Sequence, residues 1–269
     1  MSKILFTDLD GTLLTERKEI SAYTRQVLNR FSKAGHKLVL CSGRPLPSIQ
    51  EVKETLKLDY PGMYLIGFNG GCIYECDTDR ILYKDGLSME QAAHILHAAR
   101  EAGIYCHTYS DTAILSPVDG REIAFYRRNI HLHVRFADDP ASLLTDSPCK
   151  CLAIELTDPE KLERFRLSLL PWAEGKCTLV YSNQYLLEIF PATAGKGASV
   201  KKLCSLLNIP LSDSLAAGDQ GNDISMLQAA GTGIAMCNGT EDVKKAADII
   251  TPQDNDHDGL ALVLEQYIK

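Results

Sequence analysis

The chain has 269 residues, of which 45% are hydrophobic and 23% are charged, and its formal net charge at pH 7 is −7. This composition is typical of a globular protein with one or two full-sized domains, and it excludes a disordered chain, a collagen-like fibre and a disulfide-stapled miniprotein. The acidic balance provides no positive field for nucleic acid or an anionic membrane, so we expect neither as a partner.

The nine cysteines are an odd number and stand mostly in apolar runs, which favours buried free thiols in a reducing compartment. The N-terminal apolar run reaches Asp8 too soon to contain the core of a signal peptide, and no stretch approaches the roughly 18 apolar residues of a membrane span. We therefore expect a soluble, cytoplasmic protein that is a monomer or a small homo-oligomer.

The N-terminal part alternates short apolar runs with amphipathic segments. Ser21 is the expected N-cap of the first helix, and Gly35 follows its end. We expect strands at 4–7, 37–41 and 63–68, and helices at 21–34 and 47–58.

The middle of the chain has a different pattern, in which strands pair through hairpins. Asp158 and Pro159 form a helix start. We expect helices at 88–102 and 159–169, strands at 104–109, 112–116 and 151–156, and a hairpin of strands 178–181 and 185–190. This pattern predicts an inserted α+β domain at 85–190 whose joints, near 84–87 and 191–195, would let it open and close.

The C-terminal part returns to the first pattern, with strands expected at 214–217, 233–236 and 248–250 and helices at 198–207, 223–230, 240–246 and 259–268. Apolar strands interleaved with amphipathic helices predict an α/β fold with a doubly wound, Rossmann-like parallel sheet. We assign residues 1–84 and 191–269 to this core.

The loop Asp8-Leu9-Asp10-Gly11-Thr12 directly follows the first predicted strand. In an open parallel sheet, ligands bind beyond the carboxyl ends of the strands, so both aspartates lie where a site is expected. Two carboxylates so close together repel each other unless a cation or a proton intervenes. An ordinary turn is the alternative, because Asp and Gly are common turn residues.

A second acidic loop, with the sequence GDQGND, begins at Gly218 after another predicted strand. A helix start with one N-cap residue would account for only part of this cluster of carboxyl and amide groups. If Asp8, Asp10 and Asp219 converge at adjacent strand ends, they form the oxygen-rich pocket that Mg²⁺ prefers.

Ser42 and Lys196 are two further candidates at the ends of predicted elements. Ser42 precedes Gly43, so its hydroxyl and the following backbone N–H groups could bind an anion; an ordinary loop serine is the alternative. Lys196 lies between two glycines at the start of a helix, without the Ser or Thr that a Walker A motif requires after the lysine. An exposed lysine is the alternative there.

Taken together, four segments in this order resemble the motifs of the haloacid dehalogenase superfamily of phosphohydrolases. The segments are Asp8-Leu9-Asp10-Gly11-Thr12-Leu13-Leu14, Ser42-Gly43-Arg44-Pro45, Lys196-Gly197 and Gly218-Asp219-Gln220-Gly221-Asn222-Asp223. The match is closest to the Cof-like subfamily IIB, in which a large α+β cap of the C2 type is inserted after the third core strand. The chain departs from the family pattern at two places. The family often has Asn-Gly-Ala where this chain has Asn69-Gly70-Gly71, and it usually has Gly and Ser before the lysine where this chain has Thr193 and Gly195. These departures concern substrate fit.

The resemblance implies Mg²⁺-dependent hydrolysis of a phosphomonoester through an aspartyl-phosphate intermediate. Asp8 would attack phosphorus, and Asp10 would protonate the leaving alcohol and then activate water. Mg²⁺ would be held by the Asp8 side chain, the Asp10 backbone carbonyl and Asp219. Asp223 would orient the metal ligands or Lys196. The phosphoryl oxygens would be held by Ser42, Lys196, Asn222 and the backbone N–H groups of Leu9 and Gly43.

Relatives with this cap often accept several sugar phosphates or other small phosphorylated metabolites, so we expect a substrate of this class. Tyr181, Asn183 and Glu188 are candidates for contacting it from the cap. A phosphomutase or phosphotransferase of the same superfamily is an alternative, because it would use the same intermediate and return the phosphate to a sugar. A non-catalytic sensor of a phosphorylated ligand would be expected to have lost a residue such as Asp8 or Lys196, and both are present.

Overall fold

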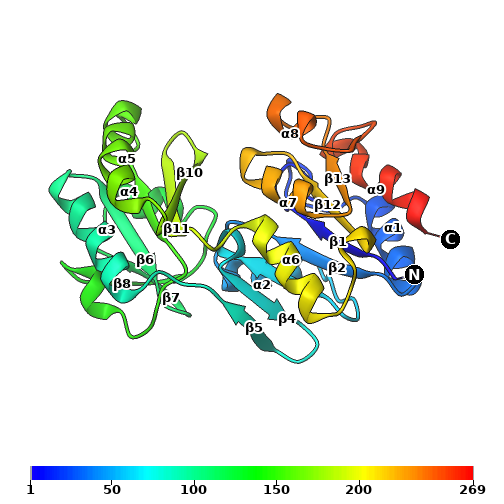
Figure 1. The fold of residues 1–269 in the computed structure, drawn as a ribbon, viewed down its shortest axis with the longest axis horizontal. Coiled ribbons are helices and arrows are strands. Elements are labelled where there is room, and N and C mark those ends of the chain that lie inside the picture. The colour runs from blue at the N-terminus through cyan, green and yellow to red at the C-terminus, as the bar shows by residue number, and fades with distance from the viewer. Residues whose placement is uncertain (1, 269) are drawn as a thin grey trace. The chain divides into compact units, whose positions relative to one another are not determined.

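The structure is a computed structural model that describes residues 2–268, and it contains two compact units (Figure 1). The first unit is formed by the chain up to Tyr83 and from Gly195 onward, and the second unit is Lys84–Ala194. Lys84 and residues 191–194 therefore fall in the second unit, whereas the sequence analysis assigns them to the core. No helix in the described part of the chain is long and apolar enough to cross a lipid bilayer.

Within the described residues, the first unit contains an eight-stranded sheet with helices packed against it. Its strands are β1 (Ile4–Thr7), β2 (Lys37–Cys41), β3 (Tyr64–Gly67), β4 (Cys72–Glu75), β5 (Arg80–Lys84), β12 (Ser214–Gly218), β13 (Thr232–Ala235) and β14 (Ile249–Ile250). Its helices are α1 (Ala22–Lys33), α2 (Leu46–Thr55), α6 (Lys196–Leu206), α7 (Ile224–Ala229), α8 (Glu241–Lys245) and α9 (Gly259–Leu264). Short 3₁₀ turns lie at Phe68–Gly70, Leu211–Asp213, Gly221–Asp223, Asn255–His257 and Glu265–Tyr267.

The strand order is β14-β13-β12-β1-β2-β3-β4-β5. The strands from β14 to β3 are parallel, which confirms the predicted α/β core. The sheet also extends beyond this prediction, because β4 pairs with β3 in antiparallel orientation and β5 lies beside β4. These two strands are short and only partly buried, so they lack the continuous apolar run that marks the central strands.

Side chains on both faces of the central strands are buried. Ile4 and Phe6 of β1 pack in one cluster with residues of α6, α7 and α8. Leu5 between them points to the opposite face and is also fully buried. A strand covered on both faces must be apolar throughout, which explains why β1 has no alternation of polar and apolar residues.

The second unit has a six-stranded sheet in its described residues, with the order β10-β11-β9-β6-β7-β8. Its strands are β6 (Tyr105–Tyr109), β7 (Ala113–Ser116), β8 (His133–Phe136), β9 (Cys151–Ile154), β10 (Cys177–Asn183) and β11 (Leu186–Pro191). Its helices are α3 (Met89–Glu101), α4 (Arg121–Tyr126) and α5 (Pro159–Ala173), and Pro140–Leu143 is a 3₁₀ turn. The antiparallel hairpin of β10 and β11 confirms the predicted pairing. Two elements were not predicted from the sequence: the short helix α4, which buries only Ile123 and Tyr126, and the short, largely exposed strand β8.

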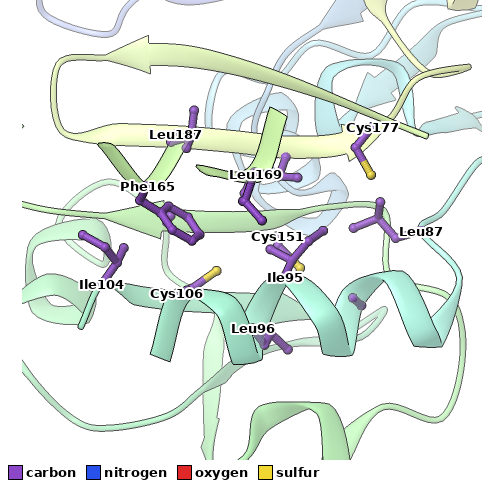
Figure 2. Close-up of a cluster of buried hydrophobic side chains, with 14 of the residues drawn as sticks. Leu87, Ile95, Leu96, Ile104, Cys106, Cys151, Phe165, Leu169, Cys177 and Leu187 are labelled. Atoms are coloured by element: carbon purple, nitrogen blue, oxygen red, sulfur yellow. The ribbon is translucent and has the colours of Figure 1, made fainter. Parts of the chain in front are cut away.

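One face of this sheet carries the apolar core of the second unit (Figure 2). Ile95 and Leu96 of α3 and Phe165 of α5 pack there against strand residues such as Cys106 and Cys151. All nine cysteines of the chain are free, and most of them are buried.

The opposite face buries polar groups instead. Lys150 and Glu188 form an ion pair in which both side chains are buried. His107 Nε2 lies 2.9 Å from the Tyr109 hydroxyl, which donates to the hydroxyl of Tyr126 at 2.7 Å. Burial, with a contribution from Lys150, lowers the pKa of His107 to about 3. This histidine is therefore neutral in the folded protein near neutral pH.

Candidate active site

The candidate site is built on the loops that follow the adjacent parallel strands β1 and β12. The register pairs Thr7 at the end of β1 with Ala217 in β12, and the N–H of Asp8 donates to the carbonyl of Ala217 at 2.9 Å. Asp8 therefore leaves the sheet beside Gly218 and Asp219. Both aspartates are buried, with exposed fractions of 8% for Asp8 and 4% for Asp219.

Lys196 connects these loops from the first position of α6, where its side chain is 1% exposed. Its Nζ lies 2.5 Å from an oxygen of Asp8 and 2.5 Å from an oxygen of Asp223. Burial alone would lower the pKa of Lys196, but the charges of Asp223 and Asp8 raise it above its ordinary value. The lysine is therefore a buried ammonium, and the alternative of an exposed lysine is wrong.

The glycine after Lys196 lets α6 approach the next helix closely. A Cβ at Gly197 would lie 2.2 Å from the carbonyl oxygen of Ser225, which is closer than such atoms can approach. The N–H of Gly197 also donates to Ser225 Oγ at 3.2 Å. This contact holds the start of α6, and with it Lys196, against the acidic loops.

Asp8, Asp219 and Asp223 form one acidic cluster, in which one carboxylate oxygen of each lies within 4.8 Å of the others. Burial raises the pKa of Asp8 well above its usual value; the Lys196 ammonium opposes this rise, and the charges of Asp223 and Asp219 add to it. Burial likewise raises the pKa of Asp219. Burial and mutual repulsion thus disfavour the carboxylate forms of Asp8 and Asp219 unless positive charge beyond that of Lys196 compensates them.

This set of donors fits a divalent cation that prefers oxygen ligands, because three carboxylates and one ammonium leave two negative charges to offset. Asp223 uses one oxygen for Lys196, and its other oxygen accepts the N–H groups of Asp219 and Gln220 at 3.1 Å each. Both oxygens of Asp219 also accept hydrogen bonds, from Thr12 Oγ1 at 2.9 Å and from Gln220 Nε2 at 3.1 Å. All three carboxylates are therefore candidates to hold an ion, and Asp223 in addition fixes Lys196 and the second acidic loop.

Gly11 and Thr12 hold Asp219 from the first loop. Thr12 Oγ1 donates to an oxygen of Asp219 at 2.9 Å. Gly11 adopts φ +78°, and a Cβ there would lie 2.5 Å from the other carboxylate oxygen of Asp219. Gly11 is thus required both by its backbone conformation and by the close approach of this carboxylate.

The side chain of Asp10 lies outside the acidic cluster. Arg44 donates to its carboxylate through Nε at 3.1 Å and Nη2 at 2.9 Å, and Lys18 donates to it at 2.8 Å. Burial would raise the pKa of Asp10, but Arg44 and Lys18 outweigh this effect and lower it. The Asp10 side chain is therefore held as a carboxylate away from the acidic cluster. The metal ligand expected from Asp10 is its backbone carbonyl, not this side chain.

The other predicted phosphate-binding residues lie on the loops after β1, β2 and β12. Leu9 is fully buried directly after Asp8. Ser42 follows β2 and is 4% exposed, with Gly43 next in the chain. The side chain of Asn222 meets another amide, because its Nδ2 donates to Oδ1 of Asn69 at 3.3 Å.

Several residues that take part in these contacts were given no role on the basis of the sequence. Thr12 and Arg44 lie inside the segments that resemble the family motifs, so their positions in those motifs could have indicated a role in the site. Asn69 belongs to the segment that stands where the family often has Asn-Gly-Ala, and Lys18 to a polar stretch with no motif. The contacts of Asn69 and Lys18 depend on where separate loops meet, and no local pattern predicts them.

Three residues of the second unit were candidates for substrate contact. The Tyr181 hydroxyl donates to Glu163 at 2.9 Å, and Oδ1 of Asn183 accepts a backbone N–H within the β10–β11 turn. Glu188 is paired with Lys150. Each side chain thus has a structural contact within its own unit.

Comparison with known proteins agrees with the geometry of the first unit. The model of a family described as haloacid dehalogenase-like hydrolase matches residues 5–264. Several curated relatives come from Bacillus subtilis (strain 168), and two of them illustrate the match. The protein named "Putative phosphatase YxeH" is 30% identical over 100% of this chain and 99% of its own length. The 5-amino-6-(5-phospho-D-ribitylamino)uracil phosphatase YwtE is 27% identical over 99% of this chain and 98% of its own length.

Among solved structures, a haloacid dehalogenase-like hydrolase from Bacteroides thetaiotaomicron has a TM-score of 0.89 to this chain at 32% identity. The match covers 99% of this chain and 100% of that one, so both units have counterparts in the relative.

Proposed function

Because the chain belongs to the haloacid dehalogenase-like hydrolases and is a phosphatase, we propose that it hydrolyses small phosphorylated metabolites, sugar phosphates in particular, through an aspartyl-phosphate intermediate. The observation that carries this proposal is the contact of the buried Lys196 ammonium with both Asp8 and Asp223 at 2.5 Å. The relative that acts on a phosphoribitylamino compound supports a phosphorylated metabolite of similar size as the substrate.

Asp8 is the proposed nucleophile. One of its carboxylate oxygens contacts Lys196, and its other oxygen is the atom available for attack on phosphorus. The bond from phosphorus to the leaving oxygen breaks as the acyl phosphate forms. Mg²⁺, held by Asp8, Asp219 and the Asp10 carbonyl, would offset the repulsion between this carboxylate and the anionic ester.

Asp10 is the proposed acid and base. The carboxylate form that Arg44 and Lys18 favour suits the second half-reaction, in which a base takes a proton from the water that hydrolyses the acyl phosphate. Asp10 is left protonated by that step, and in the first half-reaction of the next turnover it would give this proton to the leaving alkoxide. Lys196, Ser42, Asn222 and the backbone N–H groups of Leu9 and Gly43 are proposed to hold the phosphoryl oxygens.

Phosphate release from a panel of sugar, nucleotide and cofactor phosphates tests the proposal. The Asp8→Asn variant should fold like the wild type and lose turnover by at least about a thousandfold, because an amide cannot form the acyl phosphate. Asp242→Asn, at an aspartate whose side chain is 81% exposed, is the matched control. Turnover by Asp8→Asn at the wild-type rate would refute the nucleophile. Conversion of a hexose phosphate to an isomer with little free phosphate would identify a mutase instead.

Removal of metal is the second test. Chelation with EDTA should stop phosphate release, and added Mg²⁺ should restore it because the acidic cluster has uncompensated negative charge. Ca²⁺ should substitute poorly, because its larger and looser coordination shell changes the geometry of attack. Full activity in excess chelator would count against a cation at Asp8 and Asp219.

A further inference from the structure

The chain adopts a strained backbone at the turn after β3. Phe68 and Asn69 have φ values of +54° each, and Gly70 follows with φ +102°. The left-handed region is unfavourable for residues with a Cβ, especially bulky ones, and three consecutive residues there are unusual. Such strain persists where surrounding contacts impose it, and it concentrates at functional sites.

Two loops of the candidate site impose this conformation. The N–H of Phe68 donates to the carbonyl of Arg44 at 2.9 Å, and the N–H of Asn69 donates to that of Ser42 at 3.1 Å. On the other side, a Cβ at Gly70 would lie 2.3 Å from the carbonyl oxygen of Gly195, which immediately precedes Lys196. The turn is therefore packed between the Ser42 loop and the start of α6.

The side chain of Asn69 contacts two proposed phosphate-binding groups. It is 3% exposed, and its Oδ1 accepts the N–H of the Asn222 amide at 3.3 Å. A Cβ at Gly43 would lie 2.9 Å from the same oxygen, so the Asn69 amide packs directly against the Gly43 backbone. One buried amide thus touches the loops after β2 and β12 at once.

We infer that Asn69 is a positioning residue of the phosphate site, which orients Asn222 and supports Gly43. The amide nitrogen of Asn222 has two N–H groups, and donating one to Asn69 directs the other away from it. This inference rests on the proposed function, because it takes Asn222 and Gly43 as phosphate-binding groups. The left-handed backbone alone does not explain an asparagine at position 69, since glycine adopts this conformation without a Cβ.

Asn69→Gly tests the inference, because it removes the amide and suits the backbone. We expect a Tm no lower than that of the wild type. Affinity for inorganic phosphate, titrated calorimetrically with Mg²⁺ present, should fall about fivefold, as expected for the loss of one oriented hydrogen bond. The kcat/KM of a substrate ester should fall by a similar factor. In an Asn222→Ala background, the same change should have almost no further effect on either quantity.

Asn208→Gly is the matched control, because Asn208 also has a left-handed backbone, with φ +53°, but is exposed after the end of α6. It should bind phosphate like the wild type. The inference is overturned if Asn69→Gly binds phosphate normally, if it loses affinity equally in both backgrounds, or if its Tm falls. It is also overturned if the wild type binds no phosphate. If the wild type binds phosphate but hydrolyses no ester, the proposed function is rejected, whereas the effect of Asn69 on phosphate affinity can still be measured.

Discussion

Replacing Lys196 by methionine removes the ammonium that contacts Asp8 and Asp223 and keeps an unbranched side chain of similar length. The lysine side chain is 1% exposed, so water cannot take the place of the lost charge. Breaking a buried ion pair by removing one partner costs about 3–5 kcal/mol, because the remaining charge stays buried and unpaired. We expect the free energy of unfolding of Lys196→Met to fall by this amount in EDTA.

Added Mg²⁺ should reduce this loss of stability, because a cation at Asp8 and Asp219 would supply part of the missing positive charge. The double variant Lys196→Met/Asp223→Asn should also recover part of it, since the second change neutralises one carboxylate. Turnover should fall about 100- to 1000-fold in the single variant and should not return in the double variant, since a charged donor to the phosphoryl group is lost in both.

Urea unfolding, monitored with and without Mg²⁺, measures these free energies. Lys245→Met is the matched control, because the ion pair of Lys245 with Asp242 is exposed and should contribute less than about 1 kcal/mol. A loss below about 1 kcal/mol for Lys196→Met in EDTA would refute the reasoning, because it would mean that the ammonium does not compensate buried carboxylates.

Gly11→Ala should destabilise the protein by about 1–3 kcal/mol and lower turnover, because its Cβ displaces the Asp219 carboxylate. Gly35→Ala is the control, because Gly35 has φ +84° and no atom within 4 Å of a Cβ built there, so this variant measures only the cost of a left-handed alanine. Equal losses of stability and activity in the Gly11→Ala and Gly35→Ala variants would contradict the role of Asp219. The pKa of about 3 for His107 in the folded protein lies below its value in the unfolded chain. The free energy of unfolding should therefore decrease as the pH is lowered, by about 3 kcal/mol between about pH 7 and pH 4. Urea unfolding of His107→Phe should lack this part of the decline, and an unchanged decline would contradict it.

The central elements were predictable from local patterns. The run 4–7 is apolar because β1 is covered on both faces, and the run ends where Asp8 leaves the sheet. Ser21 caps α1 as predicted, its side chain accepting the N–H of Thr24 at 3.0 Å. By contrast, β4 and the edge strands β5 and β8 are only partly buried and have no continuous apolar run, so local patterns did not predict them.

The sequence by itself determined which residue types follow each strand, and so where carboxylates, a lysine and glycines enter the site. Only the tertiary structure decided which of them meet. Lys196 contacts Asp8 across 188 positions of chain, and the guanidinium of Arg44 pairs with the Asp10 carboxylate. Asn69 meets Asn222 because three loops converge at one end of the sheet. Side-chain contacts between distant segments depend on strand order and helix packing, and these are properties of the assembled core that no local pattern carries.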